Sequence, residues 1–427
     1  MTDVTSDHER AARLRDAVVD ELVERGEITS KEVEAVMRKV ERHRFAPEAS
    51  LEEAYHTYNA VVTKRNEHGR AVSSVSAPQI QAFMLEQAEI RPGMRVLEVG
   101  SGGLNAAYLA ELVGDAGEVT TVDIDPEVTE RTSRLLAEAG YSDVRVILAD
   151  ATEGVPAHAP YDVIMVTVGA WDVPPAWVAQ LTGNGRLVVP LRIRGLVRSI
   201  AFQREENRLV STSERICGFV SMQGAGEHEA QLLLLNGTEE IVLRFDDGLP
   251  AGAEPSLLNN AVRSPRAETW TGVFVKRGVP VDRLQMYMAT VLPGFCTMSV
   301  DADLDTGRVA PYNKRFSMAN LDGPNFAYLT VRITDDNKSF EYGVHAFGPD
   351  APAAAEAIAD HVQTWDKEHR GGPGPRIAVY PAGTPDDQIP ELPGARVIDK
   401  THCRVTLSWP STAMTGGDQG AQHHTTE

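Results

Sequence analysis

Apolar residues recur at helical spacing near the start of the chain, so residues 8–45 are predicted to form two helices. One face of the first helix carries four of these residues: Leu14, Val18, Val19 and Leu22. A hydroxyl of Thr29 or Ser30 can cap the second helix by accepting a hydrogen bond from a free backbone N–H. Residues 54–76 show no regular period and are expected to be irregular. Pro78 is suited to the first turn of a third helix.

From Met94 onward, short apolar segments of strand length alternate with longer segments of helical pattern. The predicted strands are residues 95–99, 118–123, 144–148, 162–168 and 186–190. The predicted helices between them are residues 105–113, 126–139 and 174–181. This alternation is typical of a parallel sheet with helices on both faces. Short strands at residues 198–203, 208–212 and 217–221 are expected to extend that sheet.

The pattern changes near the Gly-Ala-Gly-Glu sequence at residues 224–227, which marks a predicted domain boundary. Further strands are expected at residues 230–235, 240–245, 270–275, 327–334, 339–347, 376–380 and 402–409. Helices are expected at residues 281–292 and 351–368. These patterns predict an α/β domain over residues 1–225 and an α+β accessory domain over residues 226–412. Residues 413–427 are expected to be a disordered tail.

The composition excludes several function classes. The 427 residues carry a formal net charge of −20, which argues against nucleic-acid binding and against docking on an anionic membrane. The N-terminus is polar and no apolar run is long enough to span a bilayer, so neither a signal peptide nor a membrane segment is expected. The three cysteines lie far apart, which indicates a reducing, cytoplasmic compartment and no cysteine metal site.

The clearest chemical signal is the run Val-Leu-Glu-Val-Gly-Ser-Gly-Gly-Leu-Asn at residues 96–105. Glycines after a strand allow a tight turn and close approach to a ligand, and the following helix offers free N–H groups. A dinucleotide site would require a third glycine where Asn105 stands. Glu98 also adds negative charge where a pyrophosphate would lie. It suits a ligand with an amine or a cation, such as the sulfonium amino acid of S-adenosylmethionine.

Acidic residues follow the next two strands. Asp123 ends the second strand, where a carboxylate can accept hydrogen bonds from both hydroxyls of a ribose. Asp150 follows the third strand and can accept one from an adenine amino group. With Glu98, they form a set suited to a nucleoside. Structural alternatives exist: the glycine run can be an ordinary turn, and Asp123 or Asp125 can cap the helix that begins at Pro126. For Asp125, capping is the preferred interpretation.

With these motifs in view, residues 10–225 resemble the protein-L-isoaspartate O-methyltransferases. The family motifs T-I-S-x-P, V-L-E-x-G-x-G-x-G and G-D-G-x-x-G correspond to residues 74–78, 96–104 and 149–154. Two later stretches also match: residues 161–167 and 181–190. The resemblance implies a Rossmann-like, doubly wound class I methyltransferase sheet with N-terminal helices. It also implies S-adenosyl-L-methionine as the cofactor and a carboxylate as the methyl acceptor.

The resemblance further implies roles for individual residues. The catalytic position beside the reacting carboxylate falls on Ser76, whose alternative role is a helix cap or turn near Pro78. Cofactor contacts are expected from Glu98, Gly100, Ser101, Gly102, Asp123, Ile124, Asp150, Ala151 and Thr167. Substrate contacts are expected from Ser74, Val75, Ser76, Lys64, Arg65 and Arg70, although solvated surface charge is an equal alternative for the three basic residues. No metal is expected.

The chain departs from the family in the substrate lid and in its length. Leu104 replaces the third glycine of the motif, and residues 62–73 replace the family's P-I-G-x-G-Q-T approach to the serine. The second half contains motifs at residues 292–296, 371–376 and 397–402. With them the chain resembles actinobacterial "FxLD-system" methyltransferases of lanthipeptide biosynthesis, whose relatives methylate an aspartate in a cyclised ribosomal peptide.

Three functions remain open from the sequence. The first is methylation of an aspartate in a thioether-cyclised ribosomal peptide, leading through succinimide to isoaspartate. The second is general repair of isoaspartyl proteins, against which the altered lid and the extension argue. The third is a non-catalytic peptide-binding module with a vestigial cofactor site. The expected partner is a peptide, and the C-terminal domain is expected to bind substrate or to form a homodimer.

Overall fold

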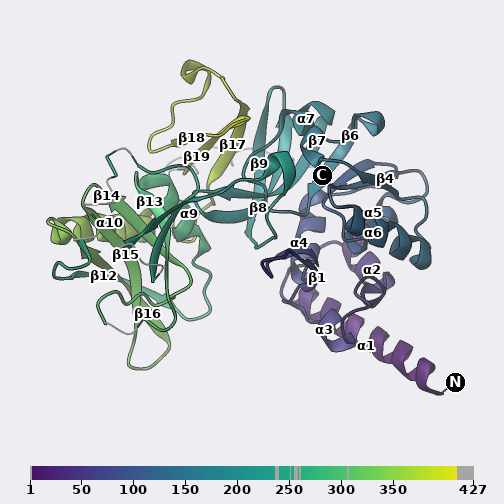
Figure 1. The fold of residues 1–427 in the computed structure, drawn as a ribbon, viewed down its shortest axis with the longest axis horizontal. Helices are drawn as coiled ribbons and strands as arrows, with labels where there is room; N and C mark the ends of the chain where they lie inside the picture. Colours follow the sequence, from purple (N-terminus) through teal and green to yellow (C-terminus); the bar gives the residue numbers. More distant parts are fainter. Residues whose placement is uncertain are drawn as a thin grey trace, which may run out of the picture.

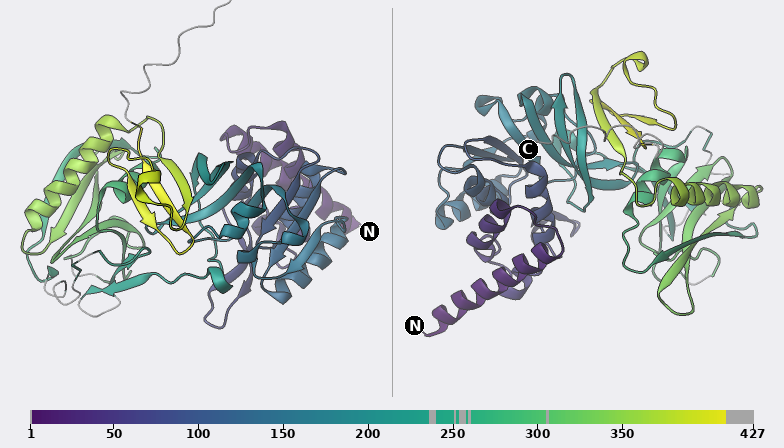
Figure 2. Two further views of the ribbon diagram at one scale, coloured as in Figure 1. Left: turned by 90° about the horizontal axis from the view of Figure 1, so that it is seen from above. Right: turned by 180° about the vertical axis from the view of Figure 1, so that it is seen from behind.

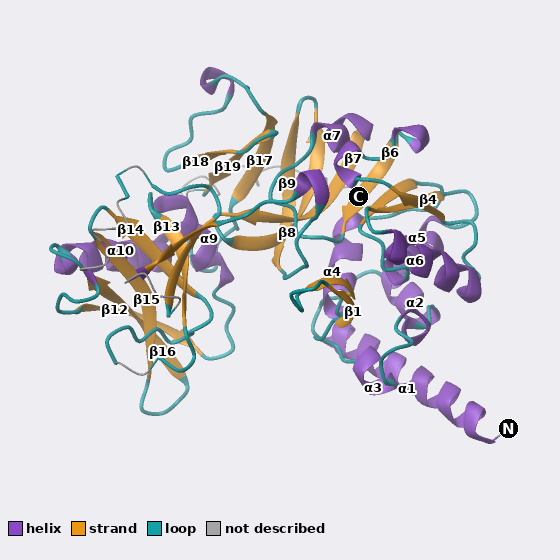
Figure 3. Cartoon of the chain, in the orientation of Figure 1, coloured by secondary structure: helices purple, strands orange, loops and turns teal. Residues whose placement is uncertain are grey.

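The first 225 residues build most of a large sheet in the computed structural model, which describes residues 2–235, 240–250, 252–253, 258, 261–304 and 307–410. A second sheet follows along the chain and lies beside the first (Figures 1 and 2). Figure 3 shows that most helices gather around the first sheet, whereas the second sheet is strand-rich. None of the helices in the described ranges has the length and hydropathy of a bilayer-spanning segment. The predicted tail, residues 413–427, lies outside the described residues.

Three N-terminal helices form as their sequence pattern predicts: α1 (Thr2–Glu24), α2 (Lys31–Lys39) and α4 (Pro78–Ala88). The short helix α3 (Leu51–Ala54) was not predicted. Ser30 caps α2, since its hydroxyl accepts a hydrogen bond from the backbone N–H of Val33. The segment expected to be irregular instead contains a β-hairpin of β1 (Val61–Arg65) and β2 (Ala71–Val75). That prediction was wrong because mixed charge along a two-stranded surface hairpin hides the alternation of a strand.

The carboxyl-terminal ends of parallel strands define one edge of the first sheet. The strands are β3 (Arg95–Val99), β4 (Glu118–Asp123), β5 (Arg145–Leu148), β6 (Tyr161–Val166) and β7 (Leu181–Ile193). They lie in the order β7-β6-β3-β4-β5, and each neighbouring pair is parallel. The chain reverses direction across the sheet between β3 and β6, which is where open α/β sheets bind ligands.

Both faces of the two central strands, β3 and β6, are buried, so their sequences are nearly continuous apolar runs. Val96 and Met165 face a core shared with the N-terminal helices, whereas Leu97 and Ile164 face the opposite core. The helices that connect the strands are α5 (Leu104–Val113), α6 (Pro126–Ala139) and α7 (Pro175–Gln180). The predicted Rossmann-like, doubly wound α/β fold of class I methyltransferases is therefore confirmed.

Antiparallel strands continue the first sheet beyond β7. They are β8 (Leu196–Glu205) and β9 (Arg208–Ile216). The strand expected over residues 217–221 does not form. Instead this segment crosses the carboxyl edge, where the amide of Gly169 donates to the carbonyl oxygen of Val220 over 2.7 Å. It forms one wall of the site described below.

The end of the chain returns to the first sheet, which corrects the predicted division at residue 225. The returning strands are β17 (Arg376–Pro381), β18 (Arg396–Asp399) and β19 (Cys403–Ser408). β17 pairs with β9 through Ala378↔Val210 and Val379↔Leu209, and the yellow strands of Figure 1 show this position. The physical reason is that β9 would otherwise expose a row of unpaired backbone groups at the sheet edge.

The second sheet is antiparallel throughout, with the order β10-β11-β13-β14-β15-β16-β12. Its strands are β10 (Gln231–Leu234), β11 (Ile241–Phe245), β12 (Ala267–Lys276), β13 (Phe295–Val300), β14 (Ser317–Asp322), β15 (Asn325–Ile333) and β16 (Ser339–Phe347). Helices α9 (Asp282–Val291) and α10 (Ala351–Glu368) accompany it, and Trp365 of α10 is buried. One apolar core runs from the first sheet to α10, so the two parts of the chain are joined by packing as well as by sequence.

Candidate functional site

A glycine turn connects β3 to α5 at the carboxyl edge. Gly100 has a φ of +92°, and a Cβ there would lie 2.8 Å from Oγ1 of Thr167. Gly103, with a φ of +82°, precedes α5. Both positions therefore require glycine. Leu104 is the first residue of α5 and is buried, so the left-handed turn is already complete before the position where the family motif has its third glycine.

Glu98 lies at the floor of the pocket beside this turn and is fully buried. Its Oε1 accepts a hydrogen bond from Nδ2 of Asn105 (2.9 Å), and its Oε2 accepts one from the hydroxyl of Thr121 (2.6 Å). Burial raises the pKa of Glu98 to about 7, although both hydrogen bonds oppose that increase. The carboxyl group is thus held in one orientation and changes charge near neutral pH.

Asp123 ends β4 and faces the same edge. Its Oδ2 accepts the backbone N–H of Ser101, and its Oδ1 accepts that of Asp125, each over 2.9 Å. Burial raises the pKa of Asp123 despite these hydrogen bonds. The neighbouring Ile124 leaves 38% of its surface exposed and offers an apolar face beside the carboxylate. The preferred interpretation of Asp125 is confirmed, because its side chain caps α6.

Asp150 follows β5 and completes the set of acids. Its Oδ1 accepts hydrogen bonds from the amide (2.9 Å) and the hydroxyl (2.6 Å) of Thr152, and its Oδ2 accepts the amide of Ala225 over 2.8 Å. Burial favours a higher pKa, but these hydrogen bonds outweigh it and hold the pKa of Asp150 below its ordinary value. Ala151 is buried, and Thr167 donates its hydroxyl to the carbonyl oxygen of Gly100 (2.9 Å).

The residues expected to contact substrate divide into two groups. Ser74, Val75 and Ser76 lie at the end of β2 and line the same pocket as Glu98. Ser74 and Ser76 also line an adjoining groove, whose other walls include Tyr58 and residues 218–221. Figure 1 shows the hairpin next to α4 at this side of the sheet. The structure therefore brings the predicted serine segment against the predicted cofactor residues.

The three basic lid residues do not reach this pocket. Lys64 forms ion pairs with Asp125 (2.6 Å) and Glu127 (2.9 Å), which fasten the hairpin to the start of α6. Arg65 donates to the carbonyl oxygen of Gly69 within the hairpin turn, and Arg70 is exposed. The ammonium group of Lys64 thus has a structural role at the start of α6, whereas its predicted substrate role stays a prediction.

Several residues of the site were missed from the sequence. Asn105 and Thr121 orient Glu98, and Phe219 lines both the pocket and the groove. Buried Arg42 donates to Oε1 of Gln81 (2.7 Å) and to the carbonyl oxygen of Val75, so it supports the serine segment from below. Asn105 stood out in the motif, whereas nothing in the local sequence around Arg42 indicated its position.

The side chains present fit the expected cofactor. The described residues that line the pocket of Glu98 include no lysine or arginine, so the pocket does not suit a pyrophosphate. Carboxylates of Glu98, Asp123 and Asp150 follow three adjacent strands of one edge. This set matches a nucleoside whose other end carries a cationic group. S-adenosylmethionine has that chemistry.

Comparisons with known proteins agree with this geometry. The sequence model of the family "Protein-L-isoaspartate(D-aspartate) O-methyltransferase (PCMT)" matches residues 13–227, half of the chain. A protein-L-isoaspartate O-methyltransferase of Ignicoccus hospitalis is 41% identical over 175 residues, which cover 41% of this chain and 80% of that relative. One of Hyperthermus butylicus is 35% identical, covering 54% of this chain and 98% of the relative.

Solved structures give a looser likeness. A chain described as a protein-L-isoaspartate O-methyltransferase is 21% identical, with a TM-score of 0.48, covering 85% of this chain and 96% of its own. A protein from Plasmodium falciparum, crystallised with S-adenosyl-L-homocysteine, is 17% identical with a TM-score of 0.43, covering 49% and 98%. On the family match and the sequence relatives, this chain belongs to the protein-L-isoaspartate O-methyltransferases, a family of S-adenosylmethionine-dependent carboxyl methyltransferases.

Proposed function

We propose that this chain methylates an aspartate side-chain carboxylate in a ribosomally made, thioether-cyclised peptide of the lanthipeptide class. The observation that carries a peptide substrate is the groove beside Ser76, which adjoins the pocket of Glu98 and shares Ser74, Ile80 and Phe219 with it. A carboxylate on a peptide in this groove lies next to the predicted methyl donor. The resemblance of the second half to lanthipeptide-associated methyltransferases supports the choice of peptide class.

In this proposal, different residues of the carboxyl edge bind different parts of the cofactor. Glu98 and the turn from Gly100 to Gly102 hold the amino-acid part, Asp123 holds the ribose hydroxyls, and Asp150 with Ala151 holds the adenine. Ile124 and Thr167 complete the pocket walls. Bound S-adenosylmethionine supplies an electrophilic methyl group on a sulfonium. The protein's contribution is to fix that group opposite the groove and to keep water out.

The acceptor needs no strong general base, because an aspartate carboxylate with an ordinary pKa of about 3.9 is already ionised at neutral pH. The groove lining contains no charged side chain among the described residues, so no side-chain cation of that lining pairs with the acceptor carboxylate. In this proposal Ser76, which lines both the pocket and the groove, donates its hydroxyl to one carboxylate oxygen and leaves the other free to attack. Alignment of this kind lowers barriers by about 7–11 kcal/mol in well-oriented reactions.

The product then rearranges without further help from the cofactor. The methyl ester makes the side-chain carbonyl electrophilic, and the backbone nitrogen of the next residue attacks it. Methanol leaves, a succinimide ring forms, and water opens the ring mainly to isoaspartate. Repair of isoaspartyl proteins is the second candidate. It is favoured by the matched relatives, which are themselves named protein-L-isoaspartate O-methyltransferases.

Mass spectrometry of matched peptides separates the two candidates. Peptides carrying aspartate or isoaspartate, each linear and thioether-cyclised, are incubated with the full chain and S-adenosylmethionine. We expect a gain of one methyl group only on the cyclised aspartate peptide, followed by loss of methanol. Methylation of linear isoaspartate peptides would instead assign the chain to repair. If S-adenosylhomocysteine binds but no peptide reacts, both substrate assignments are wrong; if it does not bind, the chain is a non-catalytic module.

Cofactor affinity is expected to depend on pH through Glu98. Because burial raises the pKa of Glu98 to about 7, the carboxylate form, which suits an ammonium group, becomes dominant only above that pH. The Kd of S-adenosylhomocysteine should therefore fall as the pH rises from about 6 to 8, by up to about tenfold per pH unit below the pKa. Isothermal titration calorimetry measures this dependence.

Glu98→Gln provides the matched control, since the amide cannot ionise and keeps a similar shape. We expect weaker binding whose Kd stays nearly constant over the same range.

The folded chain also holds its Glu98 proton more tightly than the unfolded chain does. This residue therefore lowers the free energy of unfolding as the pH rises from about 4.3 to 7, opposite to its effect on binding. If the Kd of Glu98→Gln still fell with rising pH as in the wild-type chain, the role assigned to Glu98 would be wrong.

A further inference from the structure

The turn that connects the two parts of the chain lies directly on the carboxyl end of β5. Its residues Gly224–Gly226 form one 3-10 turn, and the Ala225 amide donates to Oδ2 of Asp150 over 2.8 Å. Gly224 has a φ of +74°, and a Cβ there would lie 2.5 Å from Oδ2 of Asp150 and 2.5 Å from Cδ1 of Ile124. The connecting turn therefore lies against Asp150, which is assigned to the adenine, and against Ile124, which is assigned to the pocket wall.

This turn is fastened on each side to the same loop, the one that follows β6. Before the turn, the Met222 amide donates to the carbonyl oxygen of Gly169 over 3.0 Å. After it, the imidazole of His228 stacks on Trp171, with ring centroids 3.9 Å apart and planes inclined by 5°. We name residues 222–228 the strap. Because both its ends are fixed, the position of Ala225 over Asp150 is fixed as well.

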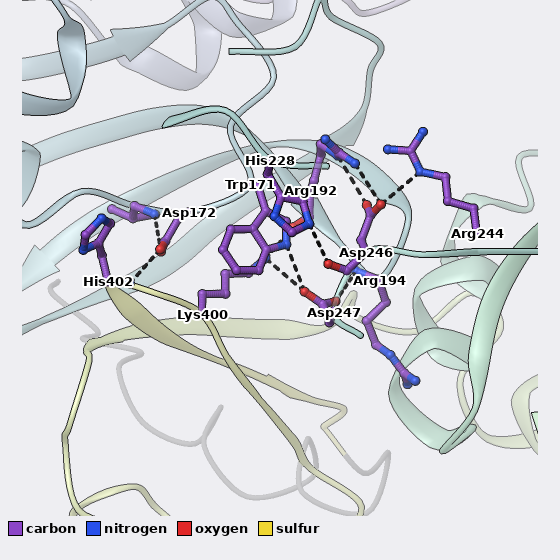
Figure 4. A network of polar contacts seen from close by, with 11 residues as sticks. Trp171, Asp172, Arg192, Arg194, His228, Arg244, Asp246, Asp247, Lys400 and His402 are labelled. Atoms are coloured by element: carbon purple, nitrogen blue, oxygen red, sulfur yellow. Dashed lines mark hydrogen bonds and ion pairs between the residues drawn. The ribbon is translucent and has the colours of Figure 1, made fainter. Parts of the chain in front are cut away.

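The loop that holds the strap is in turn held by the second half of the chain (Figure 4). The indole N–H of Trp171 donates to Oδ1 of Asp247 over 3.1 Å. The ammonium group of Lys400 lies 4.4 Å from the centre of the Trp171 ring and donates to the carbonyl oxygen of Arg192 over 3.0 Å. His228 also bonds the carbonyl oxygen of Asp246 through Nε2 over 2.7 Å. The position of the strap is therefore fixed by residues that follow β11, Asp246 and Asp247, and by Lys400 near the end of the chain.

We propose that the strap is the outer wall of the adenine pocket and that His228 is a positioning residue for cofactor binding. The Ala225 amide takes one lone pair of Oδ2 of Asp150 and fixes the carboxylate, and a second lone pair remains for an adenine amino group. The C-terminal half thereby contributes to cofactor affinity indirectly, by holding the strap in place. This inference rests on the proposed function in one respect, because it assumes that the chain binds an adenosine-containing cofactor.

The first test changes the strap at its tightest contact. Gly224→Ala adds a methyl group where Asp150 and Ile124 stand, and it strains a positive φ, so the carboxylate must move. By calorimetry on the full chain, we expect the Kd values of S-adenosylhomocysteine and of 5′-methylthioadenosine to rise together by about tenfold. Both ligands carry the adenosine end, whereas only the first carries the amino acid. Gly183→Ala is the control, because a Cβ there meets nothing within 4 Å.

The second test removes the stacking contact between His228 and Trp171. Removing the ring in His228→Ala should weaken both ligands by about three- to tenfold, the range expected for loss of one aromatic stack. His228→Phe keeps the stack and should restore most of the affinity. His402→Ala is the matched control, since only the backbone N–H of His402 joins the same network, where it donates to Asp172. The KM for peptide should not change in any of these variants.

A readout independent of affinity comes from hydrogen exchange. In the wild-type chain, S-adenosylhomocysteine should slow exchange of the Ala225 amide, because the ligand closes the pocket beneath the strap. Wild-type binding with an unchanged Kd in both Gly224→Ala and His228→Ala would overturn the inference alone. Failure of the wild-type chain to bind either ligand would overturn the proposed function, and the inference with it.

Discussion

Replacing Asp123 with alanine is expected to weaken S-adenosylhomocysteine binding by about 100-fold or more. The carboxylate at the end of β4 is oriented by two backbone amides, those of Ser101 and Asp125, so it is fixed before any ligand arrives. Two ribose hydroxyls donating to a charged group contribute about 1.5–3 kcal/mol each, and 1.4 kcal/mol corresponds to tenfold in Kd. Calorimetry of the purified variant measures the loss directly.

Asp125→Ala is the control for that prediction because it lies two residues away in the same loop. Its carboxylate caps α6 and pairs with Lys64, while its backbone N–H still supports Asp123 in the variant. We expect a loss of about 0.5–2 kcal/mol in the free energy of unfolding and a Kd within about twofold of the wild-type value. Equal losses of affinity in both variants would mean that loop order, and not the Asp123 carboxylate, determines binding.

The parallel half of the first sheet was predictable because its determinants are local. Each strand is a short apolar run, and glycines or a capping residue stand where the chain turns. Parallel strands also end at one edge, so the sequence positions of Glu98, Asp123 and Asp150 already imply that the three acids meet. The structure places them at that edge, on β3, at the end of β4 and after β5.

The pairing of β17 with β9 was not predictable in the same way. The partners Ala378 and Val210 are separated by well over a hundred residues, and an alternating strand pattern does not specify which edge it joins. The same limit applies to Lys64. Its charge in the lid suggested substrate attraction, whereas its ion pair with Asp125 depends on how the hairpin folds onto α6.

The contacts of the strap could not be predicted from the sequence either, although its glycines were apparent there. Gly-Ala-Gly at residues 224–226 is equally suited to a flexible linker and to a tight turn. Only the position of the Asp150 carboxylate, close to where a Cβ of Gly224 would stand, shows why glycine is required. A sequence boundary between two domains can therefore be part of a binding site when both of its ends are anchored.

The junction between the two halves should be the most sensitive point for stability, and Asp246→Ala is its sharpest test. Asp246 pairs with Arg192 over 2.8 Å, and their side chains are only 1% and 7% exposed. Removing the carboxylate leaves a buried guanidinium without its counter-charge, which costs about 3–5 kcal/mol. Urea unfolding should show this loss, whereas Arg244→Ala, whose side chain is 45% exposed, should cost at most about 1 kcal/mol.

The pH dependence of the same pair gives the prediction a second, independent measurement. Burial opposes ionisation of Asp246, but Arg192 and Arg244 outweigh it and hold its folded-state pKa below the ordinary value. A group with a lowered pKa stabilises the fold above its unfolded pKa of about 3.9 and loses that contribution as the pH falls through the folded value. The wild-type chain should therefore lose more stability than Asp246→Ala on acidification below about pH 4. Parallel curves for the two proteins would show that the Arg192–Asp246 pair does not hold the halves together.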